Sequence, residues 1–354
     1  MSAQIPTTMK ALISQPDKTA KVESVPVPEI GDDEVLVKVV AVALNPTDWF
    51  HIQIFGAPGM IAGCDYSGTV VKVGRNVSAR AVGEHVAGFA HGGGFRDRGA
   101  FAEYLKTDAD LCWPVPARTL SHEQAAAMGC GYWTAAQTLF HPDRLGLVEV
   151  PNKVDEEEWV LIYGGSGSVG LYAIQLAHLA GYKVVTTASP RNHALCRSLG
   201  ADAVVDYNAP DALAQVKALT HDSIRVALDA ISEADTQLFA ARALAPGGQL
   251  VTILAVSDAV KQARPDVAAR NTLVYTSLGR PFVFAGKLDV PASAGDRAFM
   301  VRWLAKTPAL VSEGKVRPNP TKLFEGGLEG INDGLKYMQE GKHSGQKIVY
   351  RIAD

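Results

Sequence analysis

The chain contains 354 residues, of which 47% are hydrophobic and 20% charged, a composition typical of a globular protein with a sizeable core. Its formal net charge of −3 gives no electrostatic reason to expect a nucleic acid or an acidic membrane surface as partner. No apolar run approaches the ~20 residues that cross a bilayer, and the N-terminal residues lack the apolar core of a signal peptide. We therefore expect a cytoplasmic protein that binds neither nucleic acid nor membrane.

The N-terminal third of the chain is rich in short β patterns separated by Gly, Pro, Asp and Asn. The predicted strands are Glu34–Val42, Tyr66–Val73, His85–Phe89 and Ala100–Leu105. Short strands at such close spacing predict a small barrel or sandwich. An Ala-rich helix then begins near Ser121, where Gln124 three residues later completes the pattern of a capping box.

From Trp159 onward, strand and helix patterns alternate. The predicted strands are Trp159–Tyr163, Lys183–Thr187, Ala203–Val205, Val226–Leu228 and Gln249–Leu254. The predicted helices between them are Ser168–Ala180, Arg191–Leu199, Ala212–Leu219 and Glu233–Leu244. This alternation indicates an α/β, Rossmann-type doubly wound parallel sheet covered on both faces. A last strand is expected at Lys347–Ile352.

The sharpest motif is a glycine-rich turn, Gly165-x-Gly167-x-x-Gly170, between the first of these strands and its helix. Gly165 permits a tight turn, Gly167 lets a pyrophosphate approach the backbone, and Gly170 lets the helix pack close to the strand. The free N–H groups at the start of the helix would then meet the phosphates. In this context the motif predicts a dinucleotide site, and a plain strand–helix turn is the alternative.

The residues after the second strand indicate which dinucleotide is bound. An NAD enzyme usually places Asp or Glu there to hold the ribose 2′-hydroxyl. Here Ser189 and Arg191 stand in that position, and a hydroxyl with a guanidinium suits a 2′-phosphate. We therefore predict NADPH as the cofactor, with Tyr207 as a further contact to the phosphate. The alternative is that Arg191 is a solvated residue of the first helical turn.

Taken together, these segments resemble the medium-chain dehydrogenase/reductase superfamily. Within it they are most similar to the zinc-free, quinone-oxidoreductase-like branch, and especially to the fungal trans-acting enoyl reductases of polyketide pathways. The stretches that carry the resemblance are VVAVALNPTDW, AGCDYSGTVVKVG, GAFAEYL, GYWTAAQTLF, VLIYGGSGSVG, TASPRN, GADAVVDY and GLEGINDGLKYMQEGKHSGQKIVYRI. The resemblance implies a GroES-like β-barrel substrate domain at 1–125, an NADPH-binding Rossmann domain at 126–306, and a C-terminal return to the substrate domain at 307–354.

The resemblance also implies a set of site residues. Cofactor contacts are expected from Asn45, Pro46, Thr47, Asp48, Thr134, Ser166, Gly167, Ser168, Val169, Ser189, Arg191, Asn192, Tyr207, Leu254, Ala255, His343, Ser344 and Lys347. The segment Tyr275–Arg280, and within it Ser277, Leu278 and Gly279, would border the substrate. Tyr132 and Trp133 beside Thr134 could form one wall of an apolar cleft, or could equally be packing residues under the helix.

The zinc ligands of related dehydrogenases are missing at the corresponding positions. The position of the first ligand falls at Asn45, and Cys64 and Asp65 replace the usual His-Glu pair. The four cysteines, Cys64, Cys112, Cys130 and Cys196, form no CxxC pair and predict neither a structural zinc lobe nor a disulfide framework. We expect no metal, which favours conjugate reduction of an activated C=C over oxidation of an alcohol.

The enolate formed by such a reduction needs a proton, and the source is left open by the sequence. Related reductases use a Tyr or Lys soon after the Asn-Pro-x-Asp segment, and this chain has neither there. His51 is the nearest titratable group and is the candidate catalytic residue. A packing histidine, with the proton supplied by solvent, is the alternative.

Three functions remain open from the sequence. The first is an NADPH-dependent, zinc-independent enoyl reductase acting on an enoyl thioester or enone, with a polyketide synthase as partner. The second is a quinone or small-enone reductase of detoxifying type. The third is a catalytically silent NADPH-binding protein. Pro281 and Pro291 interrupt a segment that relatives use for pairing, and we expect a monomer.

Overall fold

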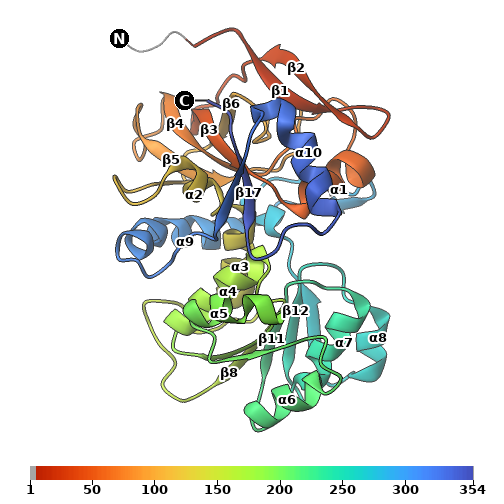
Figure 1. Cartoon of the computed structure of the whole chain (residues 1–354). Coiled ribbons are helices and arrows are strands. Elements are labelled where there is room, and N and C mark those ends of the chain that lie inside the picture. Colours follow the sequence, from red (N-terminus) through yellow and green to blue (C-terminus); the bar gives the residue numbers. More distant parts are fainter. Residues whose placement is uncertain (1–4, 354) are drawn as a thin grey trace. The chain divides into compact units, whose positions relative to one another are not determined.

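The computed structural model describes residues 5–353, which form two compact units (Figure 1). Unit 1 comprises Met1–Cys130 and Tyr275–Asp354, and unit 2 comprises Gly131–Val274. These boundaries differ from the predicted ones at 125/126 and 306/307. The segment after Val274 groups with unit 1 because Tyr275 packs against Phe89 and Arg297 forms an ion pair with Asp110.

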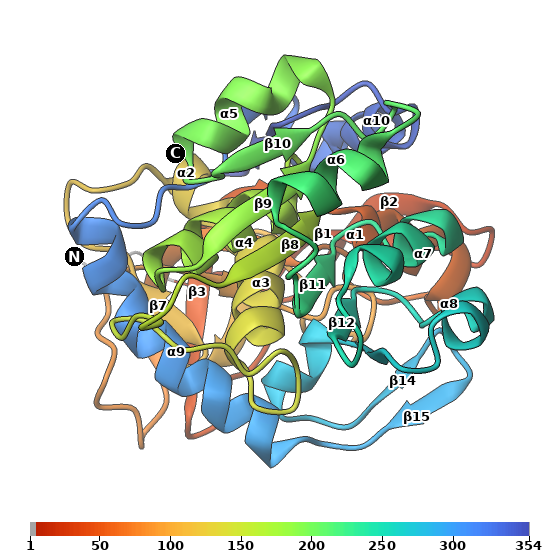
Figure 2. The ribbon, with the colours of Figure 1, turned by 90° about the horizontal axis from the view of Figure 1, so that it is seen from below.

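Unit 2 is built on a six-stranded, wholly parallel sheet in the order β10-β9-β8-β11-β12-β13. Figure 2 shows β10, β9, β8, β11 and β12 as neighbouring strands. The strands are β8 (Trp159–Tyr163), β9 (Lys183–Thr187), β10 (Ala203–Val205), β11 (Val226–Asp229), β12 (Gln249–Thr252) and β13 (Ala268–Asn271). Numbered from β8, this is the order 3-2-1-4-5-6 of a doubly wound dinucleotide fold, so the predicted sheet is confirmed.

Apart from α3, which precedes β8, the helices of unit 2 lie between successive strands of the sheet. They are α3 (Cys130–Phe140, beginning at the last residue before unit 2), α4 (Ser168–Leu179), η2 (Pro190–Asn192), α5 (His193–Ser198), α6 (Ala212–Leu219), α7 (Ala234–Ala243) and α8 (Asp258–Ala263). Their inner faces and the strands enclose a core of small and branched apolar side chains. The predicted helix at Arg191–Leu199 is shorter than expected, because Pro190 starts a 3-10 turn and the α-helix begins only at His193.

Unit 1 centres on a mainly antiparallel sheet in the order β16-β17-β3-β4-β5-β7, with β6 also paired to β3. The strands are β3 (Glu34–Ala43), β4 (Asp65–Val73), β5 (His85–Phe89), β6 (Tyr104–Asp108), β7 (Cys112–Pro114), β16 (Thr321–Phe324) and β17 (Lys347–Arg351). A hairpin of β1 (Thr8–Ser14) and β2 (Ala20–Pro26) joins it through the bridges Ala11–Ala102 and Ile13–Ile61. A second hairpin consists of β14 (Phe282–Phe284) and β15 (Leu288–Val290).

The predicted strand Ala100–Leu105 is displaced along the chain. The backbone of Phe101 and Glu103 bonds to β1 at Leu12 and Lys10, and regular pairing with β3 begins only at Tyr104. The strand therefore runs from Tyr104 to Asp108 because its partner β3 lies opposite those residues.

The helical elements of unit 1 are α1 (Pro46–Phe50), η1 (His51–Phe55), α2 (His122–Ala126), η3 (Val274–Leu278), α9 (Ala294–Ser312) and α10 (Gly327–Gln339). Ser121 and Gln124 form the predicted capping box at the start of α2. The long helix α9 was not predicted, since its pattern contains Pro308 and only a weak apolar stripe. Within residues 5–353, no helix is both long enough and apolar enough to cross a membrane.

Candidate functional site

The turn from β3 into α1 places the first group of predicted site residues in unit 1. Asn45 is the N-cap residue in extended conformation, and Pro46 at the next position is preorganised for a helix. The Asn45 N–H donates to Asp48 Oδ2 at 2.7 Å, which closes the first turn. Because the helical repeat brings residues i and i+4 together, Thr47 and His51 lie side by side.

A buried ammonium lies beside this turn. Lys347, the first residue of β17, has Nζ 3.0 Å from Asp65 Oδ2 and donates to the side-chain carbonyl of Asn45. The other oxygen of Asp65 accepts the backbone N–H of Cys130 at 2.6 Å. Lys347, Asp65 and Asn45 are all buried, so the ion pair is screened little by water.

Asp48 is a second buried carboxyl in the same cluster. Desolvation, followed by the charge of Asp65, raises the pKa of Asp48 to about 7, against the opposing effects of the Asn45 N–H, the Cys64 thiol and Lys347. Asp48 Oδ1 and Asn45 Nδ2 are buried and have no hydrogen-bond partner among the described residues. The cluster therefore offers one acceptor and one donor to a polar ligand.

A hydrogen-bonded chain of neutral side chains lies on the other side of α1. The Tyr275 hydroxyl is 2.6 Å from Thr47 Oγ1, which is 3.2 Å from His51 Nδ1, and His51 Nε2 is 3.3 Å from His91 Nε2. The His91 ring also packs against the Tyr275 ring, with centroids 4.1 Å apart and the ring planes tilted by 33°. We call these four residues, Thr47, His51, His91 and Tyr275, the relay cluster.

Burial keeps the titratable members of the relay cluster uncharged. Desolvation, with a smaller contribution from His51, lowers the pKa of His91 to about 3. Desolvation also lowers the pKa of His51, against the hydrogen bond to the Thr47 backbone. It raises the pKa of the Tyr275 hydroxyl well above its ordinary value. At neutral pH the imidazoles are therefore neutral and the phenol is protonated.

The glycine turn of unit 2 follows β8 at the point where the strand order reverses. The N–H of Gly165 donates to the Thr187 carbonyl at 2.9 Å, and a Cβ at Gly165 would lie 2.0 Å from Thr186 Oγ1. A Cβ at Gly170 would meet the Gly164 carbonyl at 2.3 Å. These two positions thus require glycine for packing within the turn.

Gly167 plays a different part in the same turn. It is the N-cap of α4, carries no side chain that could cap the helix, and a Cβ there would meet only the Gly164 carbonyl at 3.3 Å. The space above Gly167 is consequently open, and the helix N-terminus presents its dipole to it. This arrangement is suited to an anion such as a pyrophosphate.

The residues after β9 lie on the surface of unit 2. Arg191 is exposed, and its guanidinium has no ion-pair partner in the described part of the chain. Asn192 is buried, and its amide donates to Ser189 Oγ at 3.3 Å. Tyr207, in the loop after β10, is also exposed. A free guanidinium and a hydroxyl thus lie near the end of β9, where no carboxylate follows the strand.

The remaining predicted residues of unit 2 occur in two places. On α3, Tyr132, Trp133 and Thr134 are buried, and the Tyr132 ring contacts Tyr172 edge-on. Tyr132 thus packs inside unit 2. After β12, Leu254 is exposed and the Ala255 carbonyl accepts a bond from Gln237.

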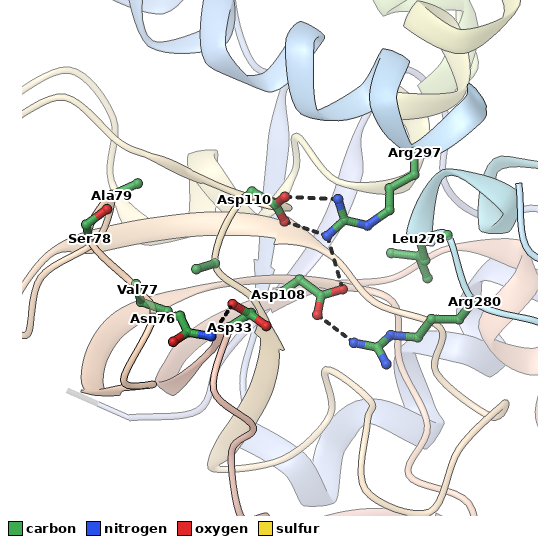
Figure 3. A pocket seen from close by; sticks show the side chains of 12 residues that line it. Asp33, Asn76, Val77, Ser78, Ala79, Asp108, Asp110, Leu278, Arg280 and Arg297 are labelled. Carbon is green, nitrogen blue, oxygen red and sulfur yellow. Dashed lines mark hydrogen bonds and ion pairs between the residues drawn. The ribbon is translucent and has the colours of Figure 1, made fainter. Parts of the chain in front are cut away.

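The residues of the predicted substrate segment lie in two different environments within unit 1. Tyr275 belongs to the relay cluster, and Ser277 is buried nearby on η3. Leu278 and Gly279 instead line a polar pocket together with the acidic residues of the β3–β6 region (Figure 3). In that pocket Arg280 contacts Asp108 at 2.5 Å. The predicted stretch Tyr275–Arg280 thus contributes residues both to the relay cluster and to this polar pocket.

The C-terminal residues also differ in their surroundings. His343 and Ser344 are half-buried in the loop before β17, and His343 Nδ1 has no hydrogen-bond partner among the described residues. Burial, with the nearby charge of Lys347, lowers the pKa of His343. Lys347 itself is engaged by Asp65 and Asn45.

Sequence reasoning did not single out His91 as a site residue. It lies two residues after the end of β5 and precedes three glycines, and Gly93 adopts a positive φ of 79°. A Cβ at Gly93 would lie 2.6 Å from the His51 Cβ, so this glycine lets the two histidines approach. A histidine followed by a glycine run was therefore the available signal. Within residues 5–353, no cluster of three or more His, Cys, Asp and Glu is placed to hold a metal ion.

Comparison with known proteins places this architecture in a family. The alcohol dehydrogenase GroES-like domain model matches residues 31–117, and the zinc-binding dehydrogenase model matches residues 168–282. A trans-enoyl reductase of Alternaria alternata is 37% identical over 352 residues, which cover 98% of this chain and 99% of that protein. One of Macrophomina phaseolina is 37% identical over 357 residues, with 98% and 99% covered.

The chain belongs to the medium-chain dehydrogenase/reductase superfamily, in its fungal trans-enoyl reductase family. Members of this superfamily are oxidoreductases that bind a nicotinamide cofactor. Among solved structures, the quinone oxidoreductase of Coxiella burnetii is 27% identical, with a TM-score of 0.74 and coverage of 98% of this chain and 100% of that one. The CurK enoyl reductase, at 22% identity and a TM-score of 0.77 over 98% and 99%, shows the same fold. The predicted pairing of a Rossmann-type sheet with a GroES-like domain is thereby confirmed.

In this trans-enoyl reductase, replacing Lys347→Met should be strongly destabilising. The substitution removes the only ammonium that contacts Asp65 among the described residues and leaves two buried carboxyls close together. Breaking one partner of a buried pair costs about 3–5 kcal/mol, and we expect a loss of that size in urea unfolding. Lys347→Met with Asp65→Asn should recover part of it.

Lys342→Met is the matched control, because Lys342 forms an exposed ion pair with Glu340 in the same segment. Because water screens this exposed pair, we expect no measurable change in the free energy of unfolding. If Lys347→Met had the same free energy of unfolding as the control, the buried Lys347–Asp65 pair would not be a source of stability.

The relay cluster should make stability depend on pH. The pKa of His91 in the folded protein, about 3, lies below its ordinary value of 6.5, so the unfolded chain binds more protons below pH 6.5. Stability therefore falls as pH decreases from about 6.5 toward 3. His91→Phe should flatten this decline by up to about 1.4 kcal/mol per pH unit.

The slope is measured from urea unfolding at several pH values between 6.5 and 4.5. His221→Asn is the control, since His221 is exposed and asparagine tolerates its positive φ of 53°. A His91→Phe slope equal to that of the unmodified protein would contradict a neutral, buried His91.

Proposed function

We propose that this chain is an NADPH-dependent, zinc-independent enoyl reductase. It reduces the activated C=C of an α,β-unsaturated thioester carried by a polyketide synthase, on which it acts in trans. The observation that carries the proposal is the open N-terminus of α4 at Gly167, in a chain aligned over 98% of its length with proteins named trans-enoyl reductases. The open helix end suits a dinucleotide, and the names of the relatives supply the substrate class.

The residues of the glycine turn fit the pyrophosphate of NADPH. Ser166, Gly167, Ser168 and Val169 form the turn, and the uncapped helix start offers N–H groups to the phosphates. Ser189, Arg191, Asn192 and Tyr207 would hold the 2′-phosphate, because the exposed guanidinium of Arg191 lacks an internal carboxylate partner in the described chain.

The nicotinamide half of the cofactor would be held by residues from several segments. The residues proposed for this role are Asn45, Pro46, Thr47, Asp48, Thr134, Leu254, Ala255, His343, Ser344 and Lys347. The unpaired Asn45 Nδ2 and Asp48 Oδ1 fit the amide of a nicotinamide, which both donates and accepts hydrogen bonds. When bound, NADPH supplies the hydride.

The residues in place of zinc ligands favour a reaction without a metal. Asn45 accepts a hydrogen bond from Lys347, and the Lys347 ammonium lies 3.0 Å from Asp65. A positive charge already present at these groups repels a divalent cation. Conjugate reduction suits such a site, because the thioester carbonyl spreads the negative charge that develops on the substrate.

Substrate contacts are proposed from Tyr132, Trp133, Thr134, Ser277, Leu278 and Gly279, with His51 as the group that supplies a proton. We also propose that the enzyme is a cytoplasmic monomer. A second candidate, reduction of quinones or small enones, is favoured by the 27% identity to the Coxiella burnetii quinone oxidoreductase. The same fold and cofactor would serve either acceptor.

A substrate panel separates these candidates. We expect the purified protein to oxidise NADPH with enoyl thioesters faster than with quinones, and to keep this activity after treatment with a chelator. Gly167→Val is the inactive control, because a branched side chain enters the space open to the pyrophosphate while only one backbone contact lies nearby. Preference for quinones would move the function to the second candidate, and no oxidation of NADPH with any acceptor would indicate a silent binder.

Arg191→Ala should weaken NADPH binding more than NADH binding. Loss of a charge-assisted hydrogen bond to the 2′-phosphate costs about 1–3 kcal/mol, whereas NADH has no phosphate there. Dissociation constants for both dinucleotides are measured by fluorescence titration. Arg197→Ala on α5 is the matched control. Equal weakening of both dinucleotides would argue against a contact between Arg191 and the 2′-phosphate.

A further inference from the structure

We infer that Tyr275 donates the proton that completes the reduction, and that Thr47, His51 and His91 form the chain that reprotonates it. This inference rests on the proposed function and deepens it. It moves the role of direct donor from His51 to a phenol in the same cluster. The geometry of the relay cluster carries it, as follows from the direction of each hydrogen bond.

His51 is poorly placed to donate directly, because both ring nitrogens are engaged. Nδ1 lies 2.8 Å from the Thr47 carbonyl, and Nε2 lies 3.3 Å from His91 Nε2. A carbonyl oxygen only accepts, so His51 carries its proton on Nδ1. Nε2 of His51 is then an acceptor, and His91 must donate to it from its own Nε2.

The next two hydrogen bonds connect His51 to Tyr275 through Thr47. The His51 Nδ1–H also lies within 3.2 Å of Thr47 Oγ1, which can accept it as a shared hydrogen bond. The Thr47 hydroxyl is then free to donate to the Tyr275 oxygen, 2.6 Å away. Because the Tyr275 oxygen accepts from Thr47, the Tyr275 O–H points away from the other members of the relay cluster. The Thr47 carbonyl and Thr47 Oγ1 share the His51 Nδ1–H, and through Oγ1 the donors of His91, His51 and Thr47 form a continuous path to Tyr275.

The surroundings keep the Tyr275 phenol protonated until a strong base reaches it. Tyr275 is buried among aromatic rings that include Phe89, Phe282 and Phe284. Besides Thr47 Oγ1, the Cys64 thiol lies within hydrogen-bond distance of the Tyr275 hydroxyl, at 3.9 Å. Burial raises the pKa of Tyr275 well above its ordinary value, so a phenolate does not form spontaneously at neutral pH. An enolate is a much stronger base than a phenolate and takes this proton.

The reduction has two parts, hydride addition at the β-carbon and proton transfer to the α-carbon. Hydride addition to the β-carbon of the enoyl thioester moves the C=C electron pair onto the thioester carbonyl and gives an enolate. The enolate α-carbon then forms a C–H bond as the Tyr275 O–H bond breaks. The phenolate takes a proton from Thr47, which takes one from His51 Nδ1, while His51 Nε2 receives one from His91 and His91 is reprotonated by water. The net change is one hydride and one solvent proton added across the double bond.

The test follows the fate of that proton in D₂O with NADPH and an enoyl thioester. The unmodified enzyme should place deuterium on one face of the α-carbon. Tyr275→Phe should lower kcat by about 100-fold, the scale of general-acid catalysis, and give deuterium on both faces. Its dissociation constant for NADPH should change less than twofold. Thr47→Val should act similarly at saturating NADPH, and Thr47→Ser should restore selectivity because it keeps the hydroxyl.

Tyr350→Phe is the matched control. Tyr350 is another buried tyrosine of unit 1, and its hydroxyl donates to the Gly330 carbonyl at 2.7 Å. It should retain the facial selectivity and the rate of the unmodified enzyme. Unchanged rate and selectivity in folded Tyr275→Phe would overturn the assignment of Tyr275 while leaving enoyl reduction intact. If Tyr275→Phe does not fold, Thr47→Val becomes the deciding variant. Unchanged facial selectivity in Thr47→Val would overturn the proposed proton transfer through Thr47 to Tyr275. No NADPH oxidation by the unmodified enzyme would overturn the proposed function, and this inference with it.

Discussion

The buried ammonium of Lys347 joins three segments of unit 1 that are far apart in the chain. It pairs with Asp65 at the start of β4 and donates to Asn45, the N-cap of α1, and it is itself the first residue of β17. Because a buried charge is costly without partners, this contact keeps the first turn of α1 beside β4 and β17. The position of Thr47 on the first turn of α1 follows from it, and so does the position of His51 one turn later.

Two kinds of buried polar cluster meet around α1, and they differ in what they can do. On one side, charges are balanced by an ion pair, and burial, followed by the charge of Asp65, raises the pKa of Asp48 to about 7. On the other side, the relay cluster contains only neutral groups connected by hydrogen bonds. A charged cluster favours holding a ligand in one orientation, whereas a neutral hydrogen-bonded chain favours passing a proton. Both depend on the same short helix.

The sequence predicted the parts of the fold whose pattern is local. The strands β8 and β9 and the glycine turn were located correctly because short apolar strands, glycines and caps leave signals within a few residues. The site in unit 1 was less predictable, because contacts between Thr47 and Tyr275 span more than two hundred residues. His51 was identified as a titratable group, but its contact with His91, 40 residues later, depends on the loop conformation that Gly93 allows. Helix α9 was missed because its apolar positions are scattered.

The central claim is that this oxidoreductase delivers a hydride from NADPH to an enoyl thioester. The most direct measurement is the position of the label in the product after turnover with NADPH that carries deuterium at the transferring position. Mass spectrometry and NMR of the saturated thioester should show that deuterium at the β-carbon and a solvent proton at the α-carbon. A product without deuterium at the β-carbon, or labelled NADPH left unconsumed in the presence of enoyl thioesters, would contradict the account.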